Sequence, residues 1–437
     1  MLTKRSRHAI RGVWWPRNAA RAALPCSYLL LMLLTGIPMV LFDRNPSRND
    51  QGAHWHRVEG LLAGNLHAVA DPNGGEGWGG IIDGTFQTFN NTAVNSPFVY
   101  WPSLLSGGDY RTACLLTLCA AALTTTAGIA LAGELGCCIA GTAILPMVYF
   151  SYLYPTADAV TNSYALLYIG YILYLHGKEK LGVIDYVMLT AASVLLGQIK
   201  ATCLVLVSLL IVPAVRQHGV RRVAFVLPAV GAVVSAGLWM LTVRDIVPAP
   251  EAVSGPELES LKSAMLRNPL LLVESMAATL FQPLDFSDET SGDRLVNPQR
   301  NLQLFTGSEN TQLSMTIMVP LLFAVALLFL MGAQRNRLRA VERTVCAVVC
   351  VAFFVLTCAA MVLTWSGDPG GYAGGIQTRY IIPVIPLVAL LIPELVQVEN
   401  RRRFLIAVAV LVILSYCGIV GVHCMDWSVL PGAGTAQ

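Results

Sequence analysis

Long runs of apolar residues alternate with shorter polar connections along almost the whole of this chain. Most runs come close to the roughly 20 residues that a helix needs to cross the hydrocarbon of a bilayer. We place eleven of them, at residues 23–42, 113–132, 137–154, 160–175, 184–199, 201–215, 223–243, 313–331, 345–365, 380–396 and 404–422. The pattern predicts an all-α polytopic integral membrane protein with about 11 transmembrane helices, each satisfying its own backbone hydrogen bonds.

Composition excludes an ordinary soluble domain. Of the 437 residues, 55% are hydrophobic and only 13% are charged, which leaves too few polar side chains to cover a water-exposed surface. The 11 cysteines lie almost all inside the apolar runs, and they show no disulfide or zinc spacing.

The distribution of lysine and arginine predicts which loops face the cytoplasm. Residues 184–215 fit either one tilted helix or two short ones, and two short ones place 18 of the 29 basic residues inside. The outside then holds 20 of the 26 Asp and Glu, which follows the positive-inside rule and argues against nucleic acid as a partner. The inner basic residues are Lys4, Arg5, Arg7, Arg11, Arg17, Arg21, Lys178, Lys180, Arg216, Arg221, Arg222, Arg335, Arg337, Arg339, Arg343, Arg401, Arg402 and Arg403.

Two long outer connections divide the chain. We expect a basic cytoplasmic N-terminus at 1–22, kept as part of an anchor, and a single transmembrane domain at 23–422 with an outer tail at 423–437. The outer loops, at about 43–112 and 244–312, are expected to carry function and interfacial helices. Within the first loop, the glycine-rich stretch NGGEGWGG is expected to be a flexible link.

The polar stretch RNDQGAHWHR follows the first span directly. On a helix, Asp50, His54 and Arg57 fall on one face, away from the apolar side that holds Trp55. This face fits an acid–base or phosphate site. A solvated helix start, with Asn49 as the cap and Asp50 complementing the helix dipole, fits the same spacing, and so does an Asp/His metal site.

Three further polar clusters lie where spans meet the outer surface: at the start of the fourth span, at the crest of the short hairpin, and at the outer mouth of the tenth span. Helix capping by Thr156 or Asp158, and simple interfacial anchoring by Lys200 or Arg379, fit these positions too. An unpaired Lys200 at a low crest would need an anionic partner. The candidate substrate- and phosphate-binding residues are Asp158, Asn162, Lys200, Gln377, Arg379 and Tyr380.

In their order, these stretches resemble the bacterial membrane proteins of domain-of-unknown-function family 2142. The family's patterns are P-D-E-x-x-H-x-x-R after the first span, D-A-x-x-N at a middle span, and G-x-Q-G-R-Y-x-x-P near the end. The matching positions here are Asp50, His54, Arg57, Asp158, Asn162, Gln377, Arg379, Tyr380 and Pro383. The departures are Asn49 in place of Pro, Gln51 in place of Glu, and Thr378 in place of Gly.

Such proteins are similar to the GT-C superfamily of glycosyltransferases, and the resemblance implies a function. A sugar would pass from a polyprenyl-phosphate donor to a cell-envelope glycan or lipid acceptor at the outer face of the bacterial plasma membrane. Asp50 and His54 would be catalytic, with Asp50 as the base, and Arg57, Lys200 and Arg379 would hold the phosphate charge. No cofactor is implied, although a divalent cation stays open.

Two other classes of protein fit the same sequence. One is a transporter or flippase for a lipid-linked envelope precursor, and the other is a polysaccharide ligase or polymerase. Internal repeats and polar residues at mid-span are typical of transporters. Here the polar residues gather on one side instead, which favours the enzyme.

Overall fold

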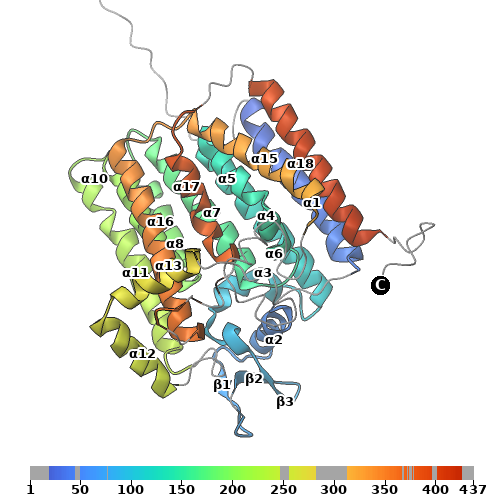
Figure 1. Cartoon of the computed structure of the whole chain (residues 1–437), viewed down its shortest axis with the longest axis vertical. Helices are drawn as coiled ribbons and strands as arrows, with labels where there is room; N and C mark the ends of the chain where they lie inside the picture. The colour runs from blue at the N-terminus through green and yellow to red at the C-terminus, as the bar shows by residue number, and fades with distance from the viewer. Residues whose placement is uncertain are drawn as a thin grey trace, which may run out of the picture.

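The computed structural model is a bundle of helices that carries a small β-sheet at one end (Figure 1). The structure describes residues 19–44, 50–75, 77–246, 255–281, 313–366, 369–371, 373, 376, 378–395 and 401–425. The predominance of helix confirms the expected helical membrane protein, while the small sheet was not expected.

Six helical stretches in this part of the chain are long and apolar enough to cross a membrane, by length and composition. They are built from α1 (Ala19–Phe42), α4 (Tyr110–Ala132) continued by η3 (Gly133–Leu135) and α5 (Gly136–Ala143), α10 (Val220–Val223) with α11 (Val226–Thr242), α15 (Met315–Ala333), α16 (Ala340–Met361) with the π-helical η7 (Val362–Ser366), and α18 (Arg401–Cys424).

The remaining apolar segments are also helical, but they are shorter or broken, so the count of eleven spans is not established by the fold. These segments form α6 (Pro146–Ser151), α7 (Ala157–His176), α8 (Val183–Leu196), η4 (Ala201–Leu210), α9 (Ile211–Ala214), η8 (Thr378–Val384) and α17 (Ile385–Leu391). Proline explains one break: Leu145 is extended before Pro146, which separates α5 from α6, because proline disfavours helical geometry at the residue before it.

Helix α7 lies at the centre of the bundle. Nearly all of its residues are buried, and it packs along α4 at very close range. Two glycines permit this approach, since a Cβ on Gly128 would lie 2.8 Å from the backbone oxygen of Leu166, and one on Gly170 would meet the backbone of Gly128. The position of α7 in the bundle is therefore set by backbone-to-backbone packing of the kind that small residues allow in membranes.

One end of the bundle collects the basic loops, and we call it the basic end. Glu342, at the start of α16, is fully buried there, with Arg216 Nε 3.2 Å and His176 Nε2 3.1 Å from its carboxylate. Arg335 lies 4.0 Å from Glu134 at the same end. Helix α7 runs about 27 Å from Asp158 to His176 at 1.5 Å per residue, so the other end of the bundle lies about that far away.

The first long loop folds over the end of the bundle opposite the basic end. It contains α2 (Gln51–Leu62), β1 (Val69–Ala70), β2 (Trp78–Ile82), β3 (Thr85–Thr88), η1 (Asn90–Val94), η2 (Pro97–Tyr100) and α3 (Trp101–Leu104). The three strands form one antiparallel sheet in the order β1-β2-β3. The expectation that the glycine-rich stretch is a flexible link was therefore wrong for its last three residues. Trp78, Gly79 and Gly80 begin β2, because cross-strand pairing with β3 orders them.

The second long loop carries two helices, as expected. They are α12 (Gly255–Arg267) and α13 (Leu270–Phe281). Two hydroxyls on α13 hold the segment that precedes η8: Ser275 accepts from the Gly370 backbone at 2.8 Å, and Thr279 accepts from the Ala373 backbone at 2.9 Å.

The α4–α7 contact gives the first testable prediction. Gly170→Val should lower the free energy of unfolding by about 1–3 kcal/mol, because the added side chain has no space against α4. The measurement is thermal unfolding of the purified protein in detergent. Gly237→Val is the matched control, since a Cβ on Gly237 in α11 meets nothing within 4 Å. Equal melting temperatures for the two variants would contradict the assignment of α4–α7 as the close contact.

Candidate functional site

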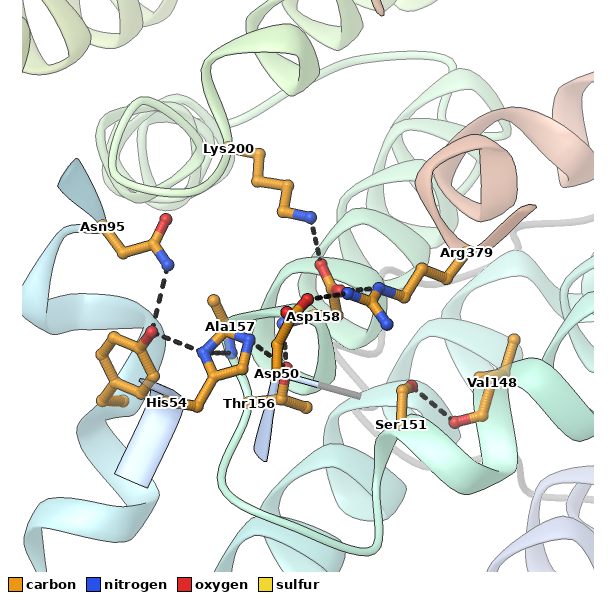
Figure 2. A network of polar contacts seen from close by, with 11 residues as sticks. Asp50, His54, Asn95, Val148, Ser151, Thr156, Ala157, Asp158, Lys200 and Arg379 are labelled. Carbon is orange, nitrogen blue, oxygen red and sulfur yellow. Dashed lines mark hydrogen bonds and ion pairs between the residues drawn. The ribbon is translucent and has the colours of Figure 1, made fainter. Parts of the chain in front are cut away.

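Four charged side chains from four separate segments meet at the end of the bundle opposite the basic end (Figure 2). Asp50 precedes α2, Asp158 lies in the first turn of α7, Lys200 precedes η4, and Arg379 lies in η8. We call these four residues the charge network and the end that carries them the network end.

Asp158 is the centre of the charge network. Its Oδ2 lies 2.6 Å from Arg379 Nε, and its Oδ1 lies 2.5 Å from Lys200 Nζ. The Asp158 side chain is only 3% exposed. A carboxylate removed from water in this way needs cations close by, because the lost hydration costs several kcal/mol per ion.

Arg379 joins the two carboxylates. Its Nη2 donates to Asp50 Oδ2 at 2.8 Å while its Nε faces Asp158, and its side chain is 4% exposed. The guanidinium was expected to hold a phosphate. The structure places two carboxylates around it, so the charge it offers is already balanced.

Asp50 is held differently from Asp158. Asn49, the cap in the alternative of a solvated helix start, lies outside the described residues. Asp50 is the residue before α2, and its side chain makes no capping hydrogen bond. Its backbone is left-handed, with φ 59° and ψ 6°, a conformation that is uncommon outside glycine and is often found at functional sites. The carboxylate points at Arg379 instead and remains 25% exposed.

Lys200 has the anionic partner that its position demanded, and that partner is Asp158. Its ammonium also lies 4.1 Å from the centre of the Tyr380 ring, which gives it a cation–π contact. At 29% exposed, Lys200 stands at the open side of the charge network. Tyr380 therefore lies against a cation of the charge network, and its role in binding substrate stays a prediction.

Two polar contacts fix the backbone on which the charge network stands. Thr156 caps α7 by accepting from the Asp158 backbone at 3.3 Å. Gln198, two residues before Lys200, bonds Ser96 of the first loop at 2.8 Å and Ser235 of α11 at 2.8 Å. The turn that carries Lys200 is thus tied to both the loop and the bundle.

His54 lies beneath the charge network as a neutral linker. Its Nδ1 lies 2.7 Å from the Tyr100 hydroxyl and faces the Ala157 backbone N–H at 3.5 Å, so Nδ1 accepts and Nε2 donates to Thr156 Oγ1 at 3.1 Å. Burial lowers the pKa of His54 to about 4. The imidazole is therefore uncharged at neutral pH and supports Thr156, rather than contacting Asp50 itself.

Arg57 is placed elsewhere, against the sequence-based prediction that it holds phosphate. Its guanidinium is fully buried and donates to the backbone oxygens of Asn65 at 3.0 Å and Leu66 at 2.9 Å. It also lies over the Phe89 ring at 5.3 Å. Helical spacing put Arg57 on the face of Asp50, but the loop that follows α2 folds back and accepts hydrogen bonds from the two terminal nitrogens of the guanidinium.

The other predicted residues have mixed positions. Asn162 is 1% exposed and lies one turn after Asp158 on α7, inside the bundle. Gln377 lies outside the described residues. Four residues that contact this site were not predicted as site residues: Tyr100, Asn95, Thr156 and Gln198. Of these, Thr156 was considered only as a helix cap.

In the part of the chain that the structure describes, no group of three or more His, Cys, Asp and Glu side chains is gathered to hold a metal ion. Both carboxylates of the charge network face cations of the protein. Lys200 and Arg379 are the cations of the arrangement, and Asp50 is the more exposed of its two carboxylates.

The fold and the charge network together define a polytopic helical membrane protein with a polar site at one end of its bundle. Residues 84–388 match the family described as predicted membrane proteins, DUF2142, and the chain belongs to that family. The match includes Asp158, Lys200 and Arg379, whereas Asp50 and His54 precede it. No curated protein and no solved structure matches the chain.

The neutral state of His54 predicts how stability depends on pH. The unfolded chain protonates His54 below about pH 6.5, but the folded protein does so only near pH 4. Its contribution is therefore complete above pH 6.5 and decreases as the pH falls toward 4, by about 3 kcal/mol in all. His54→Gln should remove this part of the acid sensitivity of the melting temperature between pH 7 and 4.5.

His56→Gln is the matched control for this measurement, because the His56 side chain is 39% exposed on the same helix. It should keep the wild-type acid sensitivity. A His54→Gln protein that loses stability with acid as steeply as wild type would show that His54 is not held neutral by burial.

Proposed function

We propose that this protein is a membrane glycosyltransferase of the GT-C type. It would move a sugar from a polyprenyl-phosphate donor to a cell-envelope glycan or lipid acceptor. The observation that carries the proposal is the charge network, which combines two cations and an accessible carboxylate at one end of a membrane bundle. Buried charges at such a position are costly to maintain, and in membrane proteins they commonly mark a functional site.

Lys200 and Arg379 bind the phosphate of the donor. Lys200 is 29% exposed beside Tyr380, and the Arg379 guanidinium faces Asp50 on the open side of the site. The departing lipid phosphate carries negative charge, so two fixed cations stabilise it as the bond to the sugar breaks. Because that phosphate is already acidic, no general acid is required.

Asp50 acts as the base for the acceptor hydroxyl. A hydroxyl oxygen of the acceptor bonds to the anomeric carbon, the bond from that carbon to the phosphate oxygen breaks, and the hydroxyl proton passes to the Asp50 carboxylate. The lipid phosphate leaves with the bonding electron pair. Direct displacement needs one base and inverts the configuration at the anomeric carbon, in contrast to the two carboxylates of glycoside hydrolases.

The lipid tail of the donor has apolar surfaces available near the site. Helix α13 exposes Leu270, Val273 and Phe281, and its hydroxyls hold the segment that leads to Arg379. An apolar helix of this kind lies in the membrane interface, where it covers an acyl chain at low cost.

The orientation we propose has all eleven apolar segments crossing the plasma membrane of a bacterium. The basic end is cytoplasmic, because 18 of the 29 Lys and Arg fall on that side. The N-terminus is inside, and the network end, both long loops and the C-terminal tail are outside. Helices α1 and α18 support this arrangement, since their ends pair through Asp43 and His423 at 3.3 Å.

Cysteine labelling tests the orientation. In a cysteine-free background, Asp83→Cys in the exposed turn between β2 and β3 should react with a membrane-impermeant maleimide in intact cells. Glu179→Cys, exposed at the basic end, should react only after the membrane is opened. Labelling of Glu179→Cys in intact cells would reverse the proposed orientation.

The Asp50 carboxylate is tested by complementation of a strain that lacks the gene. Loss of the gene should remove one sugar from the envelope glycan, and wild-type protein should restore it. Asp50→Asn should reduce transfer by roughly 10²- to 10⁴-fold, because the amide cannot accept the proton. Asp83→Asn is the matched control and should restore the sugar, since Asp83 is an exposed aspartate with the same left-handed backbone, φ 49°.

Two results would count against the assignment. Full restoration by Asp50→Asn, with no restoration by Asp158→Asn, would move the base to Asp158. An unchanged glycan in the strain without the gene, together with an altered distribution of a lipid-linked precursor across the membrane, would favour the flippase.

A further inference from the structure

The two carboxylates of the charge network are held with very different strength. Asp158 is 3% exposed, faces both Arg379 and Lys200, and stands on a helix start that Thr156 caps. Asp50 is 25% exposed, and its carboxylate reaches Arg379 through a single guanidinium nitrogen at 2.8 Å.

The backbone adds to this difference. Asp158 lies in regular helix, whereas Asp50 has a φ of 59°. A left-handed residue other than glycine is strained, and it persists only while its surroundings hold it there. The contact between Asp50 and Arg379 is therefore the part of the charge network that gives way most readily.

The charges themselves require such a step. Two carboxylates and two cations balance, so an added phosphate would bring excess negative charge into a site of low dielectric. The phosphate binds well only if a carboxylate moves away from a cation. Of the two carboxylates, only Asp50 has solvent to move into.

We propose that Asp50 is an exchangeable counterion of Arg379, and that the phosphate group of an incoming ligand takes its place on the guanidinium. The role of the freed carboxylate as a base rests on the proposed function. The exchange itself requires only a ligand with a phosphate group, on a lipid or free in solution.

The exchange sets the order of events at the site. Before the phosphate arrives, the Asp50 carboxylate is paired with Arg379, so it is not available to the acceptor hydroxyl. After the exchange, the Asp50 carboxylate is released beside the bound sugar and can contact that hydroxyl. The base is thus active only when the donor is in place, which limits loss of the sugar to water.

Binding of farnesyl phosphate to the full-length protein in detergent tests the exchange, by isothermal titration calorimetry. Asp50→Asn and Asp50→Gly should both bind roughly 3- to 10-fold more tightly than wild type, because an ion pair that must open first lowers the apparent affinity. Asp50→Gly also suits the left-handed backbone, so it should fold normally. Asp83→Asn should bind as wild type does.

Further ligands and one double variant show which interaction causes the tighter binding by the Asp50 variants. Inorganic phosphate should show the same fold-change if the phosphate group alone competes with Asp50, and no gain if the lipid must bring it into the site; farnesol should show none in either case. With Arg379→Gln as the background, adding Asp50→Asn should produce no gain.

The exchange is overturned if both Asp50 variants bind farnesyl phosphate as wild type does or more weakly. It is also overturned if the Asp50 variants bind farnesol more tightly by the same factor as farnesyl phosphate. The same holds if Asp50→Asn still tightens binding in the Arg379→Gln background. Failure of the proposed function has a different signature: the binding gain would be present, but Asp50→Asn would still restore the envelope sugar.

Discussion

The carboxylate of Asp158 between Arg379 and Lys200 is the interaction on which the network end depends. It is almost completely buried, and both cations come from segments far away in the sequence. Loss of either cation would leave a buried charge without full compensation, which typically costs about 3–5 kcal/mol. Helix α7 is enclosed by the bundle and packs against α4 at glycine positions, so the position of the Asp158 carboxylate is fixed by the bundle. Its ion pairs in turn fix Arg379 and Lys200 relative to the bundle.

The site has two parts: a rigid half, formed by Asp158 and the buried residues that support it, and a yielding half. The rigid half is supported from below by the chain of contacts from Tyr100 through His54 to Thr156, all buried. The yielding half is Asp50, which is partly exposed and strained. A site with this division can keep cations in place for a phosphate while one carboxylate changes its partner, which is what group transfer from a lipid phosphate requires.

Much of the fold could be predicted because each element depends on local sequence. Hydropathy located the apolar helical segments of the bundle, but it did not show that the run at 137–154 breaks at Pro146 or that residues 201–210 form a 3₁₀-helix. The sheet was missed because β1–β3 are short, β2 contains two glycines, and the strands are ordered by pairing with one another. At the site, Asp50, Asp158, Lys200 and Arg379 were all expected to be functional. Their mutual pairing was not, because helical spacing relates residues within one element only, and the same limitation misplaced Arg57.

The most direct test is a structure of the full chain determined with farnesyl phosphate. The account predicts phosphate density between Lys200 and Arg379, with the Asp158 contacts to both cations kept and the Asp50 carboxylate moved out of ion-pair distance from Arg379. Phosphate bound elsewhere, with all the contacts of the charge network unchanged, would contradict it.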